Sequence, residues 1–262
     1  MLIANTRRSR QPTSSGPPPY INWSSPFARG LRFAWVASHP QIELVTRVRQ
    51  SAGVGTSAVY GTGGVARVAA ANETVQFADR ADWDILGDIT CMAGVSWKAS
   101  ASTTDPSVIT KASASSDLAN CPFAFGFYNN ADVDNVRVRL GRAHATGTRH
   151  WANGSDISVL DTYFSMAASA GSAMEVAPAF YINGRDVTGT PLNLFSGAGT
   201  GAPTANGNAP TIHGTHLLTR DNGQRIYWIY IWARQLSARE HYLLGRRGWN
   251  RGDVGLFKAL SC

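Results

Sequence analysis

One segment near the end of the chain constrains the fold more than any other. Residues 226–232, IYWIYIW, are bulky and uncharged, and their β-branched and aromatic types are typical of a buried strand. Both faces of this strand are apolar, because two sets of residues alternate along it: Ile226, Trp228, Tyr230 and Trp232 on one face, and Tyr227, Ile229 and Ile231 on the other. Such a strand needs cover on both sides. We therefore expect one face to contact the core and the other to contact another segment or a partner.

A short helix is predicted directly after this strand. Ser237 precedes Glu240 by three residues, which is the spacing of a capping box. In this motif the serine hydroxyl accepts a hydrogen bond from the glutamate amide, and the glutamate carboxylate accepts one from the serine amide. Leu243 and Leu244 supply a small apolar face, and Gly245 is a natural stop. The sequence thus predicts a strand, a turn and a helix of about two turns, with Ser237 and Glu240 as structural cap residues.

Composition favours β structure in the rest of the chain. Hydrophobic residues make up 44% and charged residues only 16% of the 262 residues, and 26 residues are glycine. This balance is typical of short strands joined by many turns. Residues 88–98 alternate in polarity like a half-buried strand that contains Cys91, and Asn183-Gly184 predicts a hairpin with a type I′ turn. Short strands with almost no helix predict an all-β sandwich of two antiparallel sheets.

We expect three parts along the chain. Residues 1–19 form an extended basic arm, residues 20–250 form the sandwich, and residues 251–262 form a C-terminal tail. No run of 18 apolar residues exists and the N-terminus has no apolar signal region, so we expect neither membrane insertion nor a secretory signal. The three cysteines have no metal-binding spacing, and a reducing compartment is expected.

Positive charge is concentrated near the N-terminus. The formal net charge is +7, and residues 1–50 carry seven arginines against Glu43 alone, which is +6 (7 − 1). The planar guanidinium suits bidentate binding to carboxylates or phosphates. Nucleic acid is not expected as a partner, because the charge run is short and an acidic protein surface explains it equally well. The candidates for anchoring on such a surface are Arg7, Arg8, Arg10, Arg29 and Arg32.

Four motifs in order resemble known families. NWSSPFARGLRFAWV (22–36) resembles an opening segment common in bacteriophage structural proteins. TVQFADRADWDILGDITCMAGVSWK (74–98) is similar to the stretch that leads into the first long core strand of laminin-G-like, concanavalin A-like domains. FYINGRDV (180–187) looks like their hairpin, and residues 226–244 look like their closing strand and helix. The resemblance implies a concanavalin A-like jelly-roll sandwich whose last strand completes a sheet and whose helix closes one end.

The sequence offers little for catalysis or metal binding. Catalytic members of this fold carry a strand with a motif similar to Glu-x-Asp-x-x-Glu. No glutamate of this chain stands in such a motif. RADWD at 80–84 could offer oxygens to calcium, as in some laminin-G-like domains, but no full ligand set is present, so we expect no cofactor or metal. Trp151 is the candidate for contact with a glycan, although a packing role for it is favoured.

These observations lead to a main hypothesis and two alternatives. The main one is a non-enzymatic bacteriophage virion protein: a capsid decoration (cement) protein, made in the host cytoplasm and fastened to the particle surface by its arm and sandwich edges. Its partner would be the major capsid protein or another virion protein, and self-association is a further option. The alternative is a glycan-binding, lectin-like module of a tail or head fibre that recognises a host-surface glycan. A glycoside hydrolase is the third and least favoured option.

Overall fold

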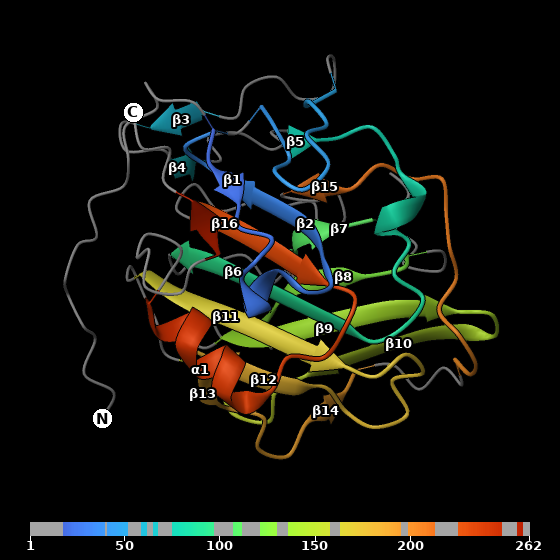
Figure 1. Ribbon diagram of the computed structural model, residues 1–262. Coiled ribbons are helices and arrows are strands. Elements are labelled where there is room, and N and C mark those ends of the chain that lie inside the picture. The colour runs from blue at the N-terminus through green and yellow to red at the C-terminus, as the bar shows by residue number, and fades with distance from the viewer. Residues whose placement is uncertain are drawn as a thin grey trace.

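Figure 1 shows a computed structural model of the chain. It describes residues 18–39, 41–51, 59–61, 65–67, 75–96, 107–111, 121–129, 136–157, 163–194, 199–212, 225–247 and 256–258. Most of the predicted arm, with Arg7, Arg8 and Arg10, lies outside the described residues.

Two antiparallel sheets pack face to face. The first has seven strands in the order β14 (Leu192–Asn193), β10 (Gly147–Ala152), β9 (Val136–His144), β8 (Ala124–Asn129), β7 (Ser107–Thr110), β15 (Thr211–Ile212) and β5 (Val75–Gln76). The second has eight strands: β13 (Arg185–Asp186), β12 (Ala179–Ile182), β11 (Tyr163–Ala170), β6 (Ile89–Ser96), β16 (Arg225–Trp232), β4 (Val65–Arg67) and β3 (Val59–Gly61), with β2 (Leu31–Val36) also paired to β16. Every strand pair is antiparallel, so the predicted all-β sandwich is confirmed.

Few other elements accompany the two sheets. Strands β1 (Tyr20–Ile21) and β17 (Phe257–Lys258) pair to form a two-stranded ribbon. Two single-turn helices precede long strands in the sequence: η1 (Pro26–Ala28) precedes β2, and η2 (Ala81–Trp83) precedes β6. Helix α1 (Ala238–Arg247) lies on the outer face of the eight-stranded sheet, over β11, β12 and β13 (Figure 1). In the described part of the chain, no helix is long and apolar enough to cross a membrane.

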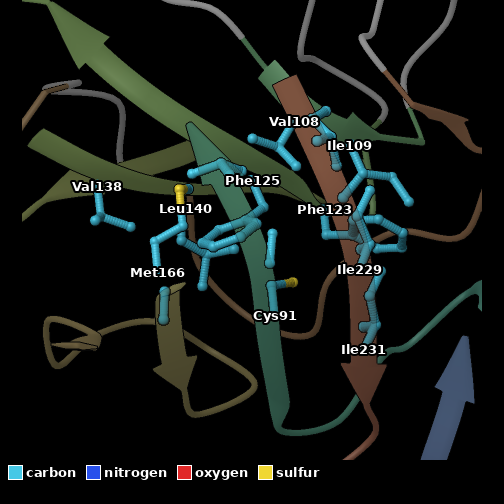
Figure 2. Packing of buried hydrophobic residues seen from close by; sticks show 14 of the residues in the cluster. Cys91, Val108, Ile109, Phe123, Phe125, Val138, Leu140, Met166, Ile229 and Ile231 are labelled. Atoms are coloured by element: carbon cyan, nitrogen blue, oxygen red, sulfur yellow. The ribbon is translucent and has the colours of Figure 1, made fainter. Parts of the chain in front are cut away.

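The inner core fills the space between the two sheets, as Figure 2 shows. Because successive side chains of a strand point to opposite faces, the longer central strands place about every second residue in this core. The seven-stranded sheet contributes large side chains such as Ile109, Phe125 and Leu140, and the eight-stranded sheet contributes Met166 and Ile229 opposite them. Cys91, in the strand predicted at 88–98, is fully buried in the same cluster.

A second apolar cluster covers the outer face of the eight-stranded sheet. Trp228, Tyr230 and Trp232 are buried there, and the cover comes from the chain itself, through residues such as Leu244 of α1 and Leu256 beside β17. The prediction that β16 is covered on both faces is therefore confirmed. The predicted alternation is wrong at two residues. The pairing of β16 with β6 shifts between Ile226 and Trp228, so Ile226 enters the inner core with Ile229 and Ile231, and Tyr227 packs against the outer cluster.

The C-terminal helix is longer than the sequence predicts. It has 10 residues and continues past Gly245, the residue expected to end it. A Cβ atom at Gly245 would lie 2.5 Å from the backbone nitrogen of Gly184. Glycine is thus needed there for the close approach of the helix to the β12–β13 hairpin. That hairpin is as predicted, because Asn183 and Gly184 both have positive φ (50° and 74°), as a type I′ turn requires.

Both ends of the described chain meet on this outer face. Residues 256–258 lie beyond the expected end of the sandwich at residue 250, yet they pair with β1. The Asn22 amide donates to the Leu256 carbonyl over 2.7 Å, and Leu256 is buried against the aromatic cover of β16. This junction positions the loop that enters β2.

Candidate binding groove

An open groove of about 530 Å³ lies where the loop 22–30 enters β2. This volume is within the range of small-molecule sites in proteins. Three stretches that are distant in the sequence form its walls: the loop 22–30 with the start of β2, the turn at 45–46, and η2. The side chains that give it chemical character are those of Trp23, Arg29, Arg32, Thr46 and Asp82.

Trp23 stands at the tip of a tight turn. The Ser25 amide donates to the Asn22 carbonyl over 2.9 Å, and the Ser25 hydroxyl accepts from the Phe27 amide to begin η1. The Trp23 side chain is 59% exposed, whereas Trp35, Trp83, Trp228 and Trp232 are buried. An exposed tryptophan that lines a groove is a candidate contact residue, because tryptophan is enriched among the residues that carry binding energy.

The charge of the groove is positive. In the part of the chain that the structure describes, neither the Arg29 nor the Arg32 guanidinium has an ion-pair partner, and both side chains are exposed. The carboxylate in the groove, Asp82, already binds Arg80 over 2.9 Å. The pKa of Asp82 is lowered, first by the hydrogen bond from Arg80 and also by the charge of the nearby Arg32.

The first wall of the groove is held by the segment that closes the fold. The Trp232 indole donates to the Phe27 carbonyl over 2.7 Å, and the Arg234 Nε donates to the Arg29 carbonyl over 2.8 Å. The Ala233 amide donates to the Gly30 carbonyl over 2.7 Å. The backbone that carries Arg29 is therefore fixed by residues about 200 positions later in the sequence.

The second wall is held by a buried carboxylate. Glu43 is fully buried, and its Oε1 accepts from the amides of Ala34 (2.7 Å) and Val45 (2.9 Å). Its Oε2 accepts from the amide and the hydroxyl of Thr46 at 2.7 and 2.6 Å. Burial raises the pKa of Glu43, and these four hydrogen bonds oppose that rise. Glu43 therefore shapes the turn at 45–46 and is unsuited to act on a ligand.

The third wall is held by Trp83 of η2. Its indole donates to the Arg32 carbonyl over 3.1 Å, and its ring packs edge-on against Phe33 and Phe77. This packing positions both Arg32 and the neighbouring Asp82. Because buried side chains hold all three walls, a ligand would find the groove already formed, which reduces the entropic cost of binding.

The capping box is connected to this groove. The Ser237 amide donates to Glu240 Oε2 over 2.8 Å, and the Glu240 amide donates to the Ser237 hydroxyl over 3.3 Å. Glu240 also accepts two hydrogen bonds from Arg234, at 2.6 and 3.1 Å, and these lower the pKa of Glu240 to about 2. The carboxylate thus caps the helix and also orients the arginine that holds the first wall.

The residues singled out from the sequence are distributed unevenly. Arg29 and Arg32 lie together in the groove. Trp151 lies elsewhere: it is partly buried against the inner core, and its indole donates to the Met174 carbonyl over 3.3 Å, an arrangement that favours packing over glycan contact. Sequence reasoning missed Trp23. The signal that could have found it is its setting between Asn22 and Ser24, with no apolar periodicity around it.

The carboxylates at 80–84 that were considered as calcium ligands already form ion pairs with protein side chains: Asp82 with Arg80, and Asp84 with Lys111. The Lys111 ammonium is fully buried and lies 2.5 Å from Asp84 Oδ1 and 2.9 Å from Asp79 Oδ1. It also donates to the Asn206 carbonyl over 2.8 Å. Across the described residues, no group of three acidic, histidine or cysteine side chains is placed to hold a metal. The calcium hypothesis therefore receives no support at 80–84.

Comparison with known proteins gives a fold and no family. No family model matches the sequence, and no curated protein matches it. Among solved structures, the binding domain of Paraclostridial Mosquitocidal Protein 1 is similar, with a TM-score of 0.56 and 11% identity over 82% of this chain and 51% of that one. The receptor binding domain of botulinum neurotoxin C/D mosaic serotype has a TM-score of 0.51 and 9% identity over 82% and 50% of the two chains.

A third solved structure extends the same finding. The binding domain of botulinum neurotoxin DC, in complex with rat synaptotagmin II, has a TM-score of 0.50 and 9% identity over 82% of this chain and 51% of that chain. The chain thus spans about half the length of the solved structures it matches. At such low identity the likeness shows a shared β-sandwich fold. The expectation of a bacteriophage virion protein remains a prediction.

Proposed function

We propose that this chain is a non-catalytic binding module that recognises a carbohydrate in the groove beside Trp23. The observation that carries the proposal is that the exposed residues Trp23, Arg29 and Arg32 line the same groove, on walls that are already in place. A pyranose ring has a face of C–H groups that packs flat on an aromatic ring, while its hydroxyls bond to polar side chains. The groove offers both kinds of contact.

The solved structures with this fold support a binding role. Each is described as a binding domain or a receptor binding domain. A shared fold does not determine function, and only about half of each of those chains is matched. The comparison therefore favours binding over catalysis, and the ligand must be argued from the groove itself.

The groove is poorly suited to hydrolysis of its ligand. A glycoside hydrolase needs two carboxyl groups on either side of the sugar bond. Among the described residues that line the groove, Asp82 is the sole carboxylate, and Arg80 binds it. Glu43 lies behind the turn at 45–46 with both oxygens occupied by donors. This arrangement supports binding without chemical change.

Attachment to a bacteriophage particle is the second candidate function. It is favoured by the +6 charge of residues 1–50 and by the resemblance of residues 22–36 to phage structural proteins. Copy number on the particle tests it: hundreds of copies would support a capsid decoration protein, and a few copies would support a tail or fibre part. The two functions are compatible, because the arm and the groove are different parts of the chain.

A glycan array with the purified chain tests the carbohydrate proposal. We expect the wild type to retain a defined set of glycans and Trp23→Ala to lose them, because the substitution removes the stacking surface. The matched control is Tyr242→Ala, another exposed aromatic residue, which does not line the groove. Both variants should keep the thermal transition of the wild type. Retention of the same glycans by Trp23→Ala, or no glycan retained by the wild type, would overturn the proposal.

A further inference from the structure

The charge balance of the groove narrows the choice of ligand. Arg32 is the exposed residue in β2, whose other side chains are buried, and it shares the groove with the exposed Arg29. The negative groups nearby are already bound: Asp82 to Arg80, Glu43 to its four donors, and Glu240 to Arg234. The two guanidinium groups therefore have no ion-pair partner in the described part of the chain, although the charge of Arg32 acts on Asp82. Such a site concentrates anions near the surface.

We infer that the ligand is an acidic saccharide whose carboxylate or sulfate binds Arg29 and Arg32 while a sugar ring packs on Trp23. This inference rests on the proposed function and names the class of ligand. The planar guanidinium matches two oxygens of a carboxylate or sulfate at once, and such charge-assisted bonds are stronger than bonds between neutral groups. Asp82 and Thr46 lie in the same groove, where their oxygens can accept from sugar hydroxyls.

The same features argue against a nucleic acid. A single strand is bound by a continuous basic track with several aromatic rings for successive bases. The groove is bounded, and Trp23 is the aromatic residue that lines it. Tyr20, the next exposed ring, already has the Arg47 guanidinium 4.1 Å above its centre. Asp82 would also repel a chain of closely spaced phosphates, whereas a saccharide with one acidic group and several hydroxyls suits two arginines and one carboxylate.

The test compares acidic saccharides with their neutral counterparts. The probes are 3′-sialyllactose and 3′-O-sulfated lactose, each against lactose, within a broad array of acidic and neutral glycans. The proteins are the wild type, the double variant Arg29→Gln/Arg32→Gln, and a control, Arg185→Gln/Arg239→Gln, with the same change in net charge at exposed arginines outside the groove. All three should have the same thermal transition.

We expect the retained glycans to be acidic and to bind at least about 10-fold more tightly than their neutral counterparts. The preference should disappear in Arg29→Gln/Arg32→Gln, persist in the control, and weaken as salt rises. Retention of neutral glycans that depends on Trp23 but not on the two arginines would overturn this inference and leave the proposed function standing. No retained glycan would overturn both. Binding of a thymidine 12-mer that requires both arginines, with no acidic glycan retained, would identify nucleic acid as the ligand class instead.

Discussion

Two charged regions of the sandwich differ in whether their positive charge is buried and paired with carboxylates or exposed to solvent. The Lys111 ammonium is fully buried and is surrounded by oxygens of Asp79, Asp84 and Asn206. The guanidinium groups of Arg29 and Arg32 are exposed, and no described residue forms an ion pair with either of them. The first charge is neutralised within the fold, and the second pair of charges faces solvent.

This difference separates stability from recognition. A buried charge that loses its partner is costly, because the protein interior solvates it poorly. An exposed charge is solvated by water, so its removal changes the folding equilibrium little and chiefly changes what the surface attracts. Changes at Lys111 should therefore chiefly affect folding, and changes at the exposed arginines of the groove should chiefly affect binding.

The largest effect is expected from Lys111→Met. The substitution keeps the length of the side chain but leaves Asp84 and Asp79 without their cation, so we expect a loss of about 3–5 kcal/mol in the free energy of unfolding, measured with urea. The partly exposed Asp79 can recover some hydration, which favours the lower end of this range. The double variant Lys111→Met/Asp84→Asn should recover part of the loss. A loss below about 1 kcal/mol would mean that the cluster is not the internal support described above.

The next largest effect concerns a titratable side chain, His241, that is buried in its uncharged form. His241 of α1 is fully buried, lies 2.7 Å from the Ser169 hydroxyl, and stacks on Tyr181 at 3.8 Å. Burial lowers the pKa of His241 to about 4, although Glu240 and Asp186 act in the opposite direction.

The unfolded chain therefore binds a proton between about pH 6.5 and pH 4 that the folded chain excludes. Stability from this residue is fully present above pH 6.5 and is lost as the pH falls towards 4, by up to about 3 kcal/mol. Urea titrations at pH 7, 5.5 and 4 measure the slope. His241→Gln should flatten it, since glutamine does not titrate, and an unchanged slope in that variant would assign the acid sensitivity to other groups.

The smallest of these effects is expected from Ser237→Ala. The substitution removes the hydroxyl that caps the Glu240 amide and should cost about 1 kcal/mol. Glu240 keeps both hydrogen bonds to Arg234, so the first wall of the groove and its glycan binding should be unchanged. Ser24→Ala, at an exposed serine of the Trp23 turn, serves as the control for loss of a hydroxyl. Loss of glycan binding in Ser237→Ala would show that the cap controls the groove.

Local patterns in the sequence predicted most of the fold. A strand within 88–98, the Asn183-Gly184 turn and the capping of Glu240 by Ser237 are each set by neighbouring residues, so they can be recognised without knowing what packs where. The expectation that this strand is half-buried is wrong, because every residue of β6 is buried and Met92 on its outward face lies in the outer apolar cluster. The shift between Ile226 and Trp228 could not be predicted this way, because it depends on how β16 pairs with β6. Nor could the continuation of α1 through Gly245, which depends on contact with a distant hairpin.

The groove was predicted only in part. Arg29 and Arg32 were identified by their charge, but they were assigned to anchoring together with an arm that lies outside the described residues. Trp23, Thr46 and Asp82 meet only after folding, since 59 positions (82 − 23) separate the first from the last. Lys111 was missed for a similar reason: its partners Asp79, Asp84 and Asn206 are spread along the sequence, and a single lysine shows no pattern.

The pairing of β1 with β17 has a mechanical consequence. Tyr20 lies opposite Lys258 and Ile21 opposite Phe257, so the chain enters and leaves the domain at the same end of one short ribbon. Tension applied through both flanks would open this ribbon like a zipper, one residue pair at a time, rather than shear all its hydrogen bonds together. The Asn22–Leu256 contact would break next, and Leu256 would leave the aromatic side chains of β16. Pulling would thus uncover the outer face of the eight-stranded sheet and loosen the Trp23 turn, while the two sheets would still be packed against each other.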